Sequence, residues 1–224
     1  MKNNYKIKTF PTGHLGCNTS IIYDAKTLEA VIIDPGEESD LILSMIKDMN
    51  FNVQYLLHTH AHYDHITASG CLKKILNIPI FLHKDDAELY KNIYLQGFML
   101  NKAVIEPGII DEYFDDNRVF KMSENHDEVL LKTIHTPGHS KGGCCFFTEI
   151  TGKPVLFSGD TLFAGSIGRT DLPGGSYNDI MNSIFKKLLI LPDETLVIPG
   201  HGEFTTIKKE KLSNPFILEN RNSF

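Results

Sequence analysis

The feature that most constrains this chain is a cluster of histidines directly after a short apolar segment. Residues 58–65 read His-Thr-His-Ala-His-Tyr-Asp-His, and within them His60, His62, Asp64 and His65 form the pattern H-x-H-x-D-H. In an extended segment, side chains two positions apart point the same way, so His60 and His62 can bind one ion from one side. Asp64 and His65 follow where the chain turns, so they can face a neighbouring ion. Imidazole and carboxylate ligands suit Zn²⁺, Mn²⁺ or Fe²⁺.

Three more candidate ligands, His139, Asp160 and His201, each follow a predicted strand. The residue before each of them is a glycine, which permits a tight turn and a close approach of the backbone. Loops at one edge of a scaffold are where a composite site is usually built. The sequence therefore predicts a site for two metal ions. Its predicted ligands are His60, His62, Asp64, His65, His139, Asp160 and His201.

The chain has ten histidines, and the five outside this ligand set are expected to be packed or surface residues. For His58 and His135, which lie close to the motifs, the alternative is that they orient the ligands. Cys144 and Cys145 lie in an apolar segment and are expected to be small core residues. The five remaining histidines are His14, His58, His83, His126 and His135.

Short strands and helices alternate along the sequence. Residues 5–10, 20–23 and 30–34 are predicted strands, rich in β-branched or aromatic residues. They follow one another too closely for helical crossovers, which disfavours a single parallel sheet. The pattern favours an α/β (α+β) fold in which two sheets pack face to face with helices outside, a four-layer sandwich. Further strands are predicted at 54–57, 80–82, 130–134, 144–147, 155–157 and 196–198, and helices at 40–49, 68–76 and 180–191.

The length favours one domain that comprises residues 1–224, because a chain of 224 residues can bury roughly 70% of its unfolded surface without disulfides. The least regular stretch, residues 84–116, lies between two metal-type motifs. Two interpretations are open for it: a cap over the active site, with a helix at 85–94, or an ordinary surface excursion.

Composition narrows the function further. The net charge of −6 disfavours nucleic-acid binding, which depends on a basic face. No apolar run reaches the roughly 18 residues that span a bilayer, and residues 1–10 have no apolar signal core. The four cysteines lack the spacing of a secreted disulfide framework. These patterns predict a cytoplasmic protein without a membrane partner, and they leave the oligomeric state open.

Together with the histidine motif, several segments resemble the metallo-β-lactamase-fold hydrolases, and among these the glyoxalase II-like thioesterases. The similarity is strongest to their short, single-domain branch, often called YcbL-like. The segments are Ile-Ile-Asp-Pro-Gly at 32–36, Thr-Pro-Gly-His at 136–139, Gly-Asp-Thr-Leu-Phe at 159–163, Gly-Arg-Thr-Asp-Leu-Pro-Gly-Gly at 168–175, Pro-Gly-His-Gly at 199–202 and Asn-Pro-Phe at 214–216.

The resemblance implies an αββα sandwich with a dinuclear centre, with zinc as the expected metal and iron or manganese as alternatives. A hydroxide shared by the two ions would be the nucleophile, because metal binding lowers the pKa of water to about 7. Asp64 would also accept a proton, so Asp64 and Asp160 are the catalytic residues that the resemblance implies. The ligand roles that it implies are His60, His62 and His139 for one ion, Asp64, His65 and His201 for the other, and Asp160 as the bridge.

The same resemblance implies hydrolysis of S-lactoylglutathione or a related small thioester. Arg169 stands where glyoxalase II-like enzymes carry a basic residue that contacts glutathione, and a guanidinium can hold a carboxylate with two hydrogen bonds. Asp171 stands where the longer enzymes commonly have an aromatic hydroxyl.

Two alternatives remain. The first is a persulfide dioxygenase with one Fe²⁺ held by His60, His139 and Asp160, since two histidines and a carboxylate make a facial site with open positions. The second is a metal-binding domain without catalysis. A β-lactamase and an RNA-processing nuclease are less favoured.

Overall fold

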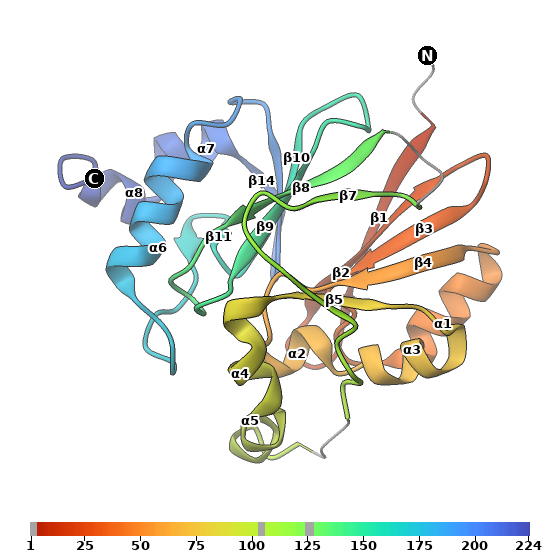
Figure 1. Ribbon diagram of the computed structural model, residues 1–224. Helices are drawn as coiled ribbons and strands as arrows, with labels where there is room; N and C mark the ends of the chain where they lie inside the picture. Colours follow the sequence, from red (N-terminus) through yellow and green to blue (C-terminus); the bar gives the residue numbers. More distant parts are fainter. Residues whose placement is uncertain (1–3, 103–105, 124–127) are drawn as a thin grey trace.

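The computed structural model describes residues 4–102, 106–123 and 128–224, which form two six-stranded sheets and a small hairpin (Figure 1). The first sheet has the strand order β1-β2-β3-β4-β5-β6. Its strands are β1 (Tyr5–Thr12), β2 (Cys17–Asp24), β3 (Glu29–Ile33), β4 (Asn52–Leu57), β5 (Ile80–His83) and β6 (Glu112–Phe114).

The second sheet has the order β14-β13-β10-β9-β8-β7. Its strands are β7 (Val119–Lys121), β8 (Val129–His135), β9 (Cys144–Thr148), β10 (Val155–Gly159), β13 (Leu196–Pro199) and β14 (Thr205–Thr206). The hairpin consists of β11 (Leu162–Phe163) and β12 (Ser166–Ile167). Strands β10 and β13 are parallel neighbours, so their carboxyl ends meet at one edge of the sheet.

The way the strands connect follows from the length of the segments between them. β1, β2 and β3 pair antiparallel through short turns, as their close spacing predicts. β3, β4, β5 and β6 are parallel, and the longer connections between them contain helices. These helices are α1 (Ser39–Asp48), α2 (Tyr63–Ile66), α3 (Ser69–Leu76), the 3₁₀ turn η1 (Lys84–Asp86), α4 (Ala87–Lys91) and α5 (Ile93–Met99).

Alternation along the strands creates three apolar layers. In β4, Leu56 packs outward against the helices of the first sheet, while Tyr55 and Leu57 point into the core between the two sheets. In the second sheet, Phe157 joins that central core, and Leu156 packs outward under the carboxyl-terminal helices. These outer helices are α6 (Tyr177–Ser183), the π-helical segment η2 (Ile184–Leu188), α7 (Ile207–Ser213) and α8 (Pro215–Asn220). The predicted four-layer sandwich is confirmed.

Two helix predictions were wrong in detail. The helix predicted at 180–191 begins earlier, at Tyr177, because the Ser176 hydroxyl accepts the Asp179 N–H and caps it. It becomes π-helical from Ile184 and ends before the predicted boundary. The helix predicted at 85–94 is divided among the 3₁₀ turn η1, α4 and the start of α5. The break between α4 and α5 lies at Asn92, whose side-chain NH₂ competes for the Glu88 carbonyl.

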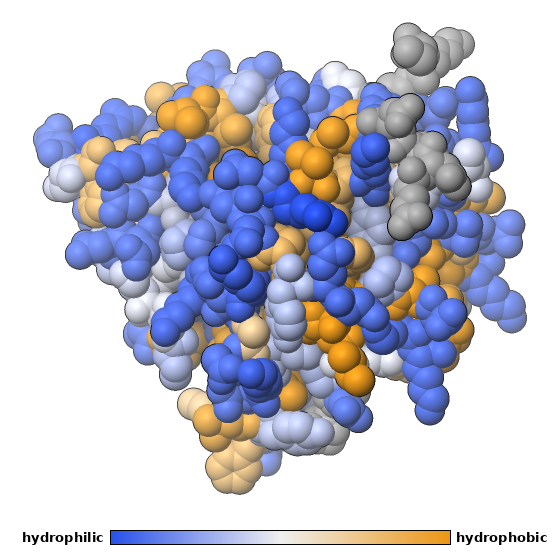
Figure 2. All heavy atoms as spheres, viewed as in Figure 1, coloured by the Kyte–Doolittle hydropathy of each residue, from blue (hydrophilic) through white to orange (hydrophobic). Residues whose placement is uncertain are grey.

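Helix α5 lies beside the histidine motif. The Gln96 side chain accepts the Tyr63 N–H at 2.9 Å and donates to the Ala61 carbonyl at 3.1 Å. On its other side α5 exposes Phe98 and Met99, and the lower end of the molecule in Figure 2 carries apolar side chains. The predicted cap stays a prediction, and residues 103–105 of it lie outside the described residues. In the part of the chain that is described, no helix is both long and apolar enough to cross a bilayer.

Candidate metal centre

All seven predicted ligands lie together where loops from both sheets meet at one edge of the sandwich. The loop after β4 carries His60 and His62, and α2 carries Asp64 and His65. The loops after β8, β10 and β13 supply the rest. Two trios have ligand atoms within 4.8 Å of one another, and a third group of that kind, His60 with His65 and Asp160, links them. Asp160 lies beside both trios. The first trio is His60, His62 and His139, and the second trio is Asp64, His65 and His201.

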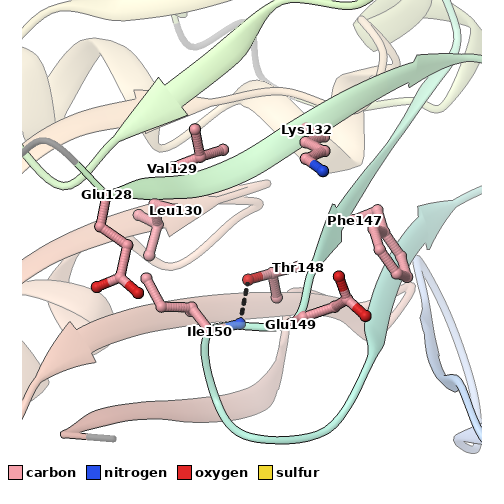
Figure 3. A pocket seen from close by; sticks show the side chains of 8 residues that line it. All are labelled: Glu128, Val129, Leu130, Lys132, Phe147, Thr148, Glu149 and Ile150. Atoms are coloured by element: carbon pink, nitrogen blue, oxygen red, sulfur yellow. Dashed lines mark hydrogen bonds between the residues drawn. The ribbon is translucent and has the colours of Figure 1, made fainter. Parts of the chain in front are cut away.

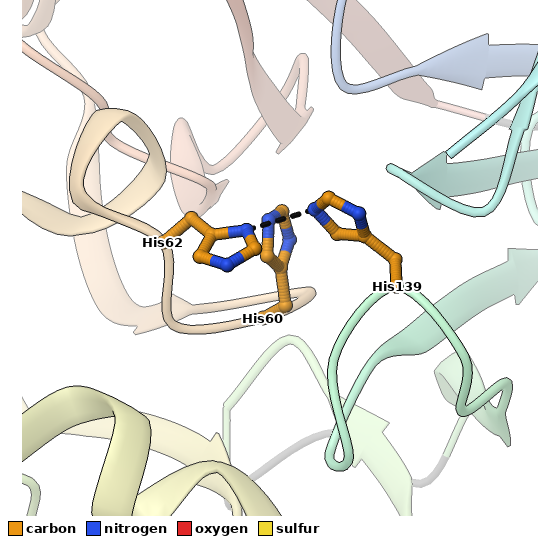
Figure 4. Close-up of side chains that lie close together, drawn as sticks. All are labelled: His60, His62 and His139. Atoms are coloured by element: carbon orange, nitrogen blue, oxygen red, sulfur yellow. Dashed lines mark hydrogen bonds between the residues drawn. The ribbon is translucent and has the colours of Figure 1, made fainter. Parts of the chain in front are cut away.

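In the first trio, three imidazole rings converge from two loops (Figure 4). His62 Nδ1 lies 2.8 Å from His139 Nε2. The His60 ring centroid lies 4.7 Å from that of His62 and 4.9 Å from that of His139. His60 is buried, and its Nε2 has no hydrogen-bond partner among the described residues.

In the second trio, His65 Nε2 lies 3.1 Å from His201 Nε2, and His201 Nε2 lies 3.1 Å from Asp64 Oδ2. Asp160 lies between the two trios. Its Oδ1 is 3.4 Å from His65 Nε2, and its Oδ2 is 3.5 Å from His139 Nε2. One carboxylate thus presents one oxygen to each trio, which is the arrangement that a bridging ligand requires.

The outer ring nitrogens are held by oxygens that can only accept a hydrogen bond. His139 Nδ1 donates to the Arg169 carbonyl at 2.8 Å, and His201 Nδ1 donates to the Leu15 carbonyl at 3.0 Å. His65 Nδ1 donates to the carboxylate of Asp34 at 3.0 Å. These bonds leave Nε2 as the nitrogen of each ring that can bind a cation.

Electrostatics differ between the rings. Burial disfavours the charged forms of His65 and His201, but the acidic groups around them outweigh burial and raise both pKa values, so a cation would displace a proton from these two rings. Burial, and then the nearby charge of His139, lower the pKa of His62 to about 3. Burial also holds the pKa of His60 well below its ordinary value, so both rings are neutral at pH 7. For Asp160 burial favours the protonated form, but the histidines around it outweigh burial and lower its pKa. Neutral imidazoles and carboxylates around one space are a donor set that fits divalent cations.

One functional residue was missing from the predicted set. Asp34 follows β3 and is buried, with a left-handed backbone at φ 49°. Its carboxylate accepts the Thr59 N–H at 2.7 Å and the Thr59 hydroxyl at 2.6 Å, in addition to His65 Nδ1. Asp34 therefore fixes the start of the histidine motif and the tautomer of one ligand. The Asp-Pro-Gly turn after a strand was the available sequence signal.

Arg169 holds its guanidinium in an exposed ion pair. The side chain is 60% exposed and pairs with the Asp171 carboxylate through two hydrogen bonds of 2.7 Å. Its contact with the centre is through the backbone carbonyl that accepts His139 Nδ1. A role of the guanidinium in substrate binding stays a prediction.

The other histidines have separate surroundings. His58 Nε2 lies 3.1 Å from Ser69 Oγ, and His14 pairs with Glu37. His83 stacks on His135, with ring centroids 4.2 Å apart and planes 16° apart. Possible ligand atoms of these two rings and of Asp85 lie within 4.8 Å of one another. However, the nitrogen lone pairs lie in the planes of the rings, and because the two planes are nearly parallel, these lone pairs cannot converge on one ion. His126 lies outside the described residues.

A hollow of about 310 Å³ opens elsewhere, on strands β8 and β9 (Figure 3). Its lining is mixed, with Glu128, Glu149 and Lys132 among apolar side chains, and none of its lining residues is a predicted ligand. We therefore place the functional site at the two trios.

Comparison with known proteins decides the family. The family model described as the metallo-beta-lactamase superfamily matches residues 12–201. This chain belongs to that superfamily. Hydroxyacylglutathione hydrolase GloC of Haemophilus influenzae is 36% identical to it over 213 residues, which cover 94% of this chain and 97% of GloC.

Two solved structures of the superfamily are close in fold. BLEG-1, described as a B3 metallo-beta-lactamase, has a TM-score of 0.83 and 32% identity, and the match covers 95% of this chain and 99% of BLEG-1. TTHA1623, solved in a di-iron-bound form, has a TM-score of 0.82 and 33% identity, with coverage of 93% and 99%. The predicted superfamily and fold are confirmed, while the roles of single ligands stay predictions.

Proposed function

We propose that this superfamily member is a glyoxalase II-type thioesterase that hydrolyses S-lactoylglutathione or a related small thioester. The observation that carries the proposal is the position of Asp160, with one carboxylate oxygen toward each trio. A centre for two ions suits hydrolysis, because two ions can activate water and stabilise the oxyanion and the leaving group. The choice of a glutathione thioester is supported by the similarity to GloC.

Two divalent ions are the proposed cofactors, with zinc first and iron or manganese as alternatives. The di-iron form of TTHA1623 supports iron as a real alternative. When bound, the ions would supply Lewis acidity and water of lowered pKa at neutral pH. The first trio would hold one ion, the second trio would hold the other, and Asp160 would bridge them.

The chain itself supplies orientation and proton transfer. The three outer hydrogen bonds from His65, His139 and His201 hold the rings in place before substrate arrives, so little reorganisation is needed during the reaction. The Asp64 carboxylate is 12% exposed and would pass a proton outward without retaining it, because His65 and His201 outweigh burial and lower its pKa. The Arg169 guanidinium would bind a carboxylate of the glutathione part after parting from Asp171.

The remaining assignments follow from this substrate. The proposed partner is a small thioester, with neither nucleic acid nor a membrane involved, in the cytoplasm. The acidic net charge of −6 supports the exclusion of nucleic acid.

The test is thiol release from S-lactoylglutathione by the full chain loaded with zinc, iron or manganese. Turnover should appear with at least one metal and should disappear in Asp160→Ala, while the thermal unfolding of this variant stays cooperative. His14→Ala is the matched control, because that ring lies in an exposed pair with Glu37 and should leave turnover unchanged. An intact substrate under all three metal conditions would refute the proposal.

β-Lactam hydrolysis is a second candidate, because BLEG-1 is 32% identical over nearly the whole chain. A chromogenic cephalosporin in the same assay separates the two activities, and we expect thioester turnover to be faster. Oxygen consumption with glutathione persulfide would instead assign the centre to a dioxygenase. A single, coordinatively saturated zinc without turnover would assign a metal-binding domain.

A further inference from the structure

Asp86 is a buried carboxylate that the proposed chemistry does not use. It ends the 3₁₀ turn η1 and is 0% exposed. Its Oδ2 accepts the Ala61 N–H at 3.0 Å and the Ser140 hydroxyl at 2.9 Å, and its Oδ1 accepts the Gly142 N–H at 2.6 Å. A buried carboxylate that accepts three hydrogen bonds is a fixed anchor in the fold.

These three partners belong to the two loops that carry the first trio. Ala61 stands between His60 and His62, and Ser140 directly follows His139. Asp86 therefore ties together two loops that are far apart in the sequence, and it does so within one residue of each ring. The second trio is held by other groups, namely Asp34 and the carbonyl of Leu15, and Asp34 also reaches the first trio through Thr59, which bonds to the His60 ring.

The chain around Asp86 is shaped for this contact. A Cβ on Gly142 would lie 2.5 Å from Asp86 N and 2.8 Å from both Asp86 Cβ and Asp86 Cγ, distances that real Cβ atoms do not show. Only glycine at this position lets the N–H of residue 142 approach the carboxylate as closely as it does. The cradle for Asp86 is thus part of the Ser-Lys-Gly-Gly segment at 140–143.

We propose that Asp86 is the positioning residue of the first trio: it sets the metal affinity of His60, His62 and His139 without touching the ion. The inference rests on the metal centre of the proposed function. All three partners of the carboxylate are donors, so an asparagine, with one acceptor oxygen and one NH₂, must leave at least one donor facing another donor. Loss of such a supporting contact typically weakens metal affinity 10–100-fold.

The experiment is a zinc titration of the metal-free full chain against a chromophoric chelator. Asp86→Asn should weaken one of the two binding steps about 10–100-fold and leave the other unchanged. Glu210→Gln is the matched control. Glu210 is also 0% exposed and also accepts three hydrogen bonds, from Gly165 N–H, Asn214 Nδ2 and the Thr205 hydroxyl, but it lies in the outer core of the second sheet.

Two backgrounds assign the affected step. In His201→Ala, where the first trio is intact, Asp86→Asn should weaken zinc binding by the same factor. In His139→Ala, where the second trio is intact, Asp86→Asn should have no effect. Weakening confined to the His139→Ala background, equal weakening of both steps, or no weakening at all would overturn the proposal.

Folding is controlled separately. If Asp86→Asn fails to give a cooperative unfolding transition, Ser140→Ala removes one of the three partners and should weaken the same step by a smaller factor; an unchanged step would then refute the inference.

None of these readouts uses a substrate. Two tightly bound ions without thioester turnover would overturn the proposed function alone, whereas turnover with identical zinc affinities in Asp86→Asn would overturn this inference alone.

Discussion

Replacing Gly200 with alanine tests the geometry of the metal centre directly. The Gly200 N–H donates to the Gly159 carbonyl at 2.8 Å, and the Gly200 carbonyl accepts the Asn18 N–H at 2.7 Å. An added Cβ would lie 2.1 Å from Asp160 Oδ1 and 2.8 Å from His65 Cε1. The φ of Gly200 is outside the left-handed region, so alanine meets no backbone strain and its effect is steric.

The size of the effect follows from these contacts. Ordinary van der Waals contact begins at 3.4 Å, so Asp160 Oδ1 must move about 1.3 Å, the difference from 2.1 Å, or the loop must move instead. A displacement of about 1 Å in a reacting group costs about 100-fold in rate. We therefore expect kcat/KM to fall at least about 100-fold, with a loss of stability of about 1–3 kcal/mol from overpacking.

The assay pairs thiol release with zinc stoichiometry and with thermal unfolding of the metal-free chain. Gly165→Ala is the control, since Gly165 has φ 71° and nothing within 4 Å of its missing Cβ. That variant should lose about 1 kcal/mol of stability from backbone strain and keep its turnover. A Gly200→Ala protein with turnover within threefold of the unaltered chain would show that Asp160 does not hold a fixed position in the centre.

Three further predictions concern Asp34, His83 and the Arg169–Asp171 pair. Asp34→Asn must place its NH₂ group against either His65 Nδ1 or the Thr59 N–H, so zinc titration should show at least one weaker step; unchanged steps would contradict this. Burial and a neighbouring histidine ring lower the pKa of His83 to about 4. Because the unfolded chain takes up this proton near pH 6.5, stability should fall by up to about 3 kcal/mol between pH 6.5 and 4, and His83→Gln should flatten that loss in urea unfolding. Asp171→Asn frees the Arg169 guanidinium and should lower KM for S-lactoylglutathione severalfold at constant kcat, whereas Arg169→Ala should raise it; equal KM values would remove Arg169 from substrate binding.

That the seven side chains lie together could be predicted from sequence, because the signals are local. His60 and His62 are two positions apart directly after a strand, so backbone geometry alone turns them the same way. His139, Asp160 and His201 each follow a glycine at the end of a strand, and strand ends of a sandwich meet at its edges. The layers could be predicted only in outline. Residues 55–57 are all apolar, which indicates that both faces of this strand are buried. The pattern does not show which face packs against the helices and which packs against the other sheet.

Apart from Asp34, the groups that support the ligands could not be predicted. They lie far from the ligands in the sequence, and some of them are backbone carbonyls, which every residue type has. The Leu15 carbonyl that orients His201 is 186 positions away, and any residue type offers a carbonyl. Asp86 is one of two adjacent aspartates, and nothing in its local pattern distinguishes it from exposed Asp85. Such contacts depend on how the two sheets stack, which no single segment encodes.

The Gly-Arg pair at 168–169 contributes to the centre through its backbone, independently of the role predicted for the Arg169 side chain. A Cβ on Gly168 would lie 1.7 Å from the Asp160 carbonyl oxygen, so the backbone can pass this close only as glycine. That close passage places the Arg169 carbonyl 2.8 Å from His139 Nδ1. The pair therefore contributes to the metal centre whatever the Arg169 guanidinium binds. Gly168→Ala should accordingly weaken zinc binding at the first trio, whereas Arg169→Ala, which keeps the carbonyl, should leave zinc binding unchanged. Equal zinc affinities in the two variants would contradict this division of roles.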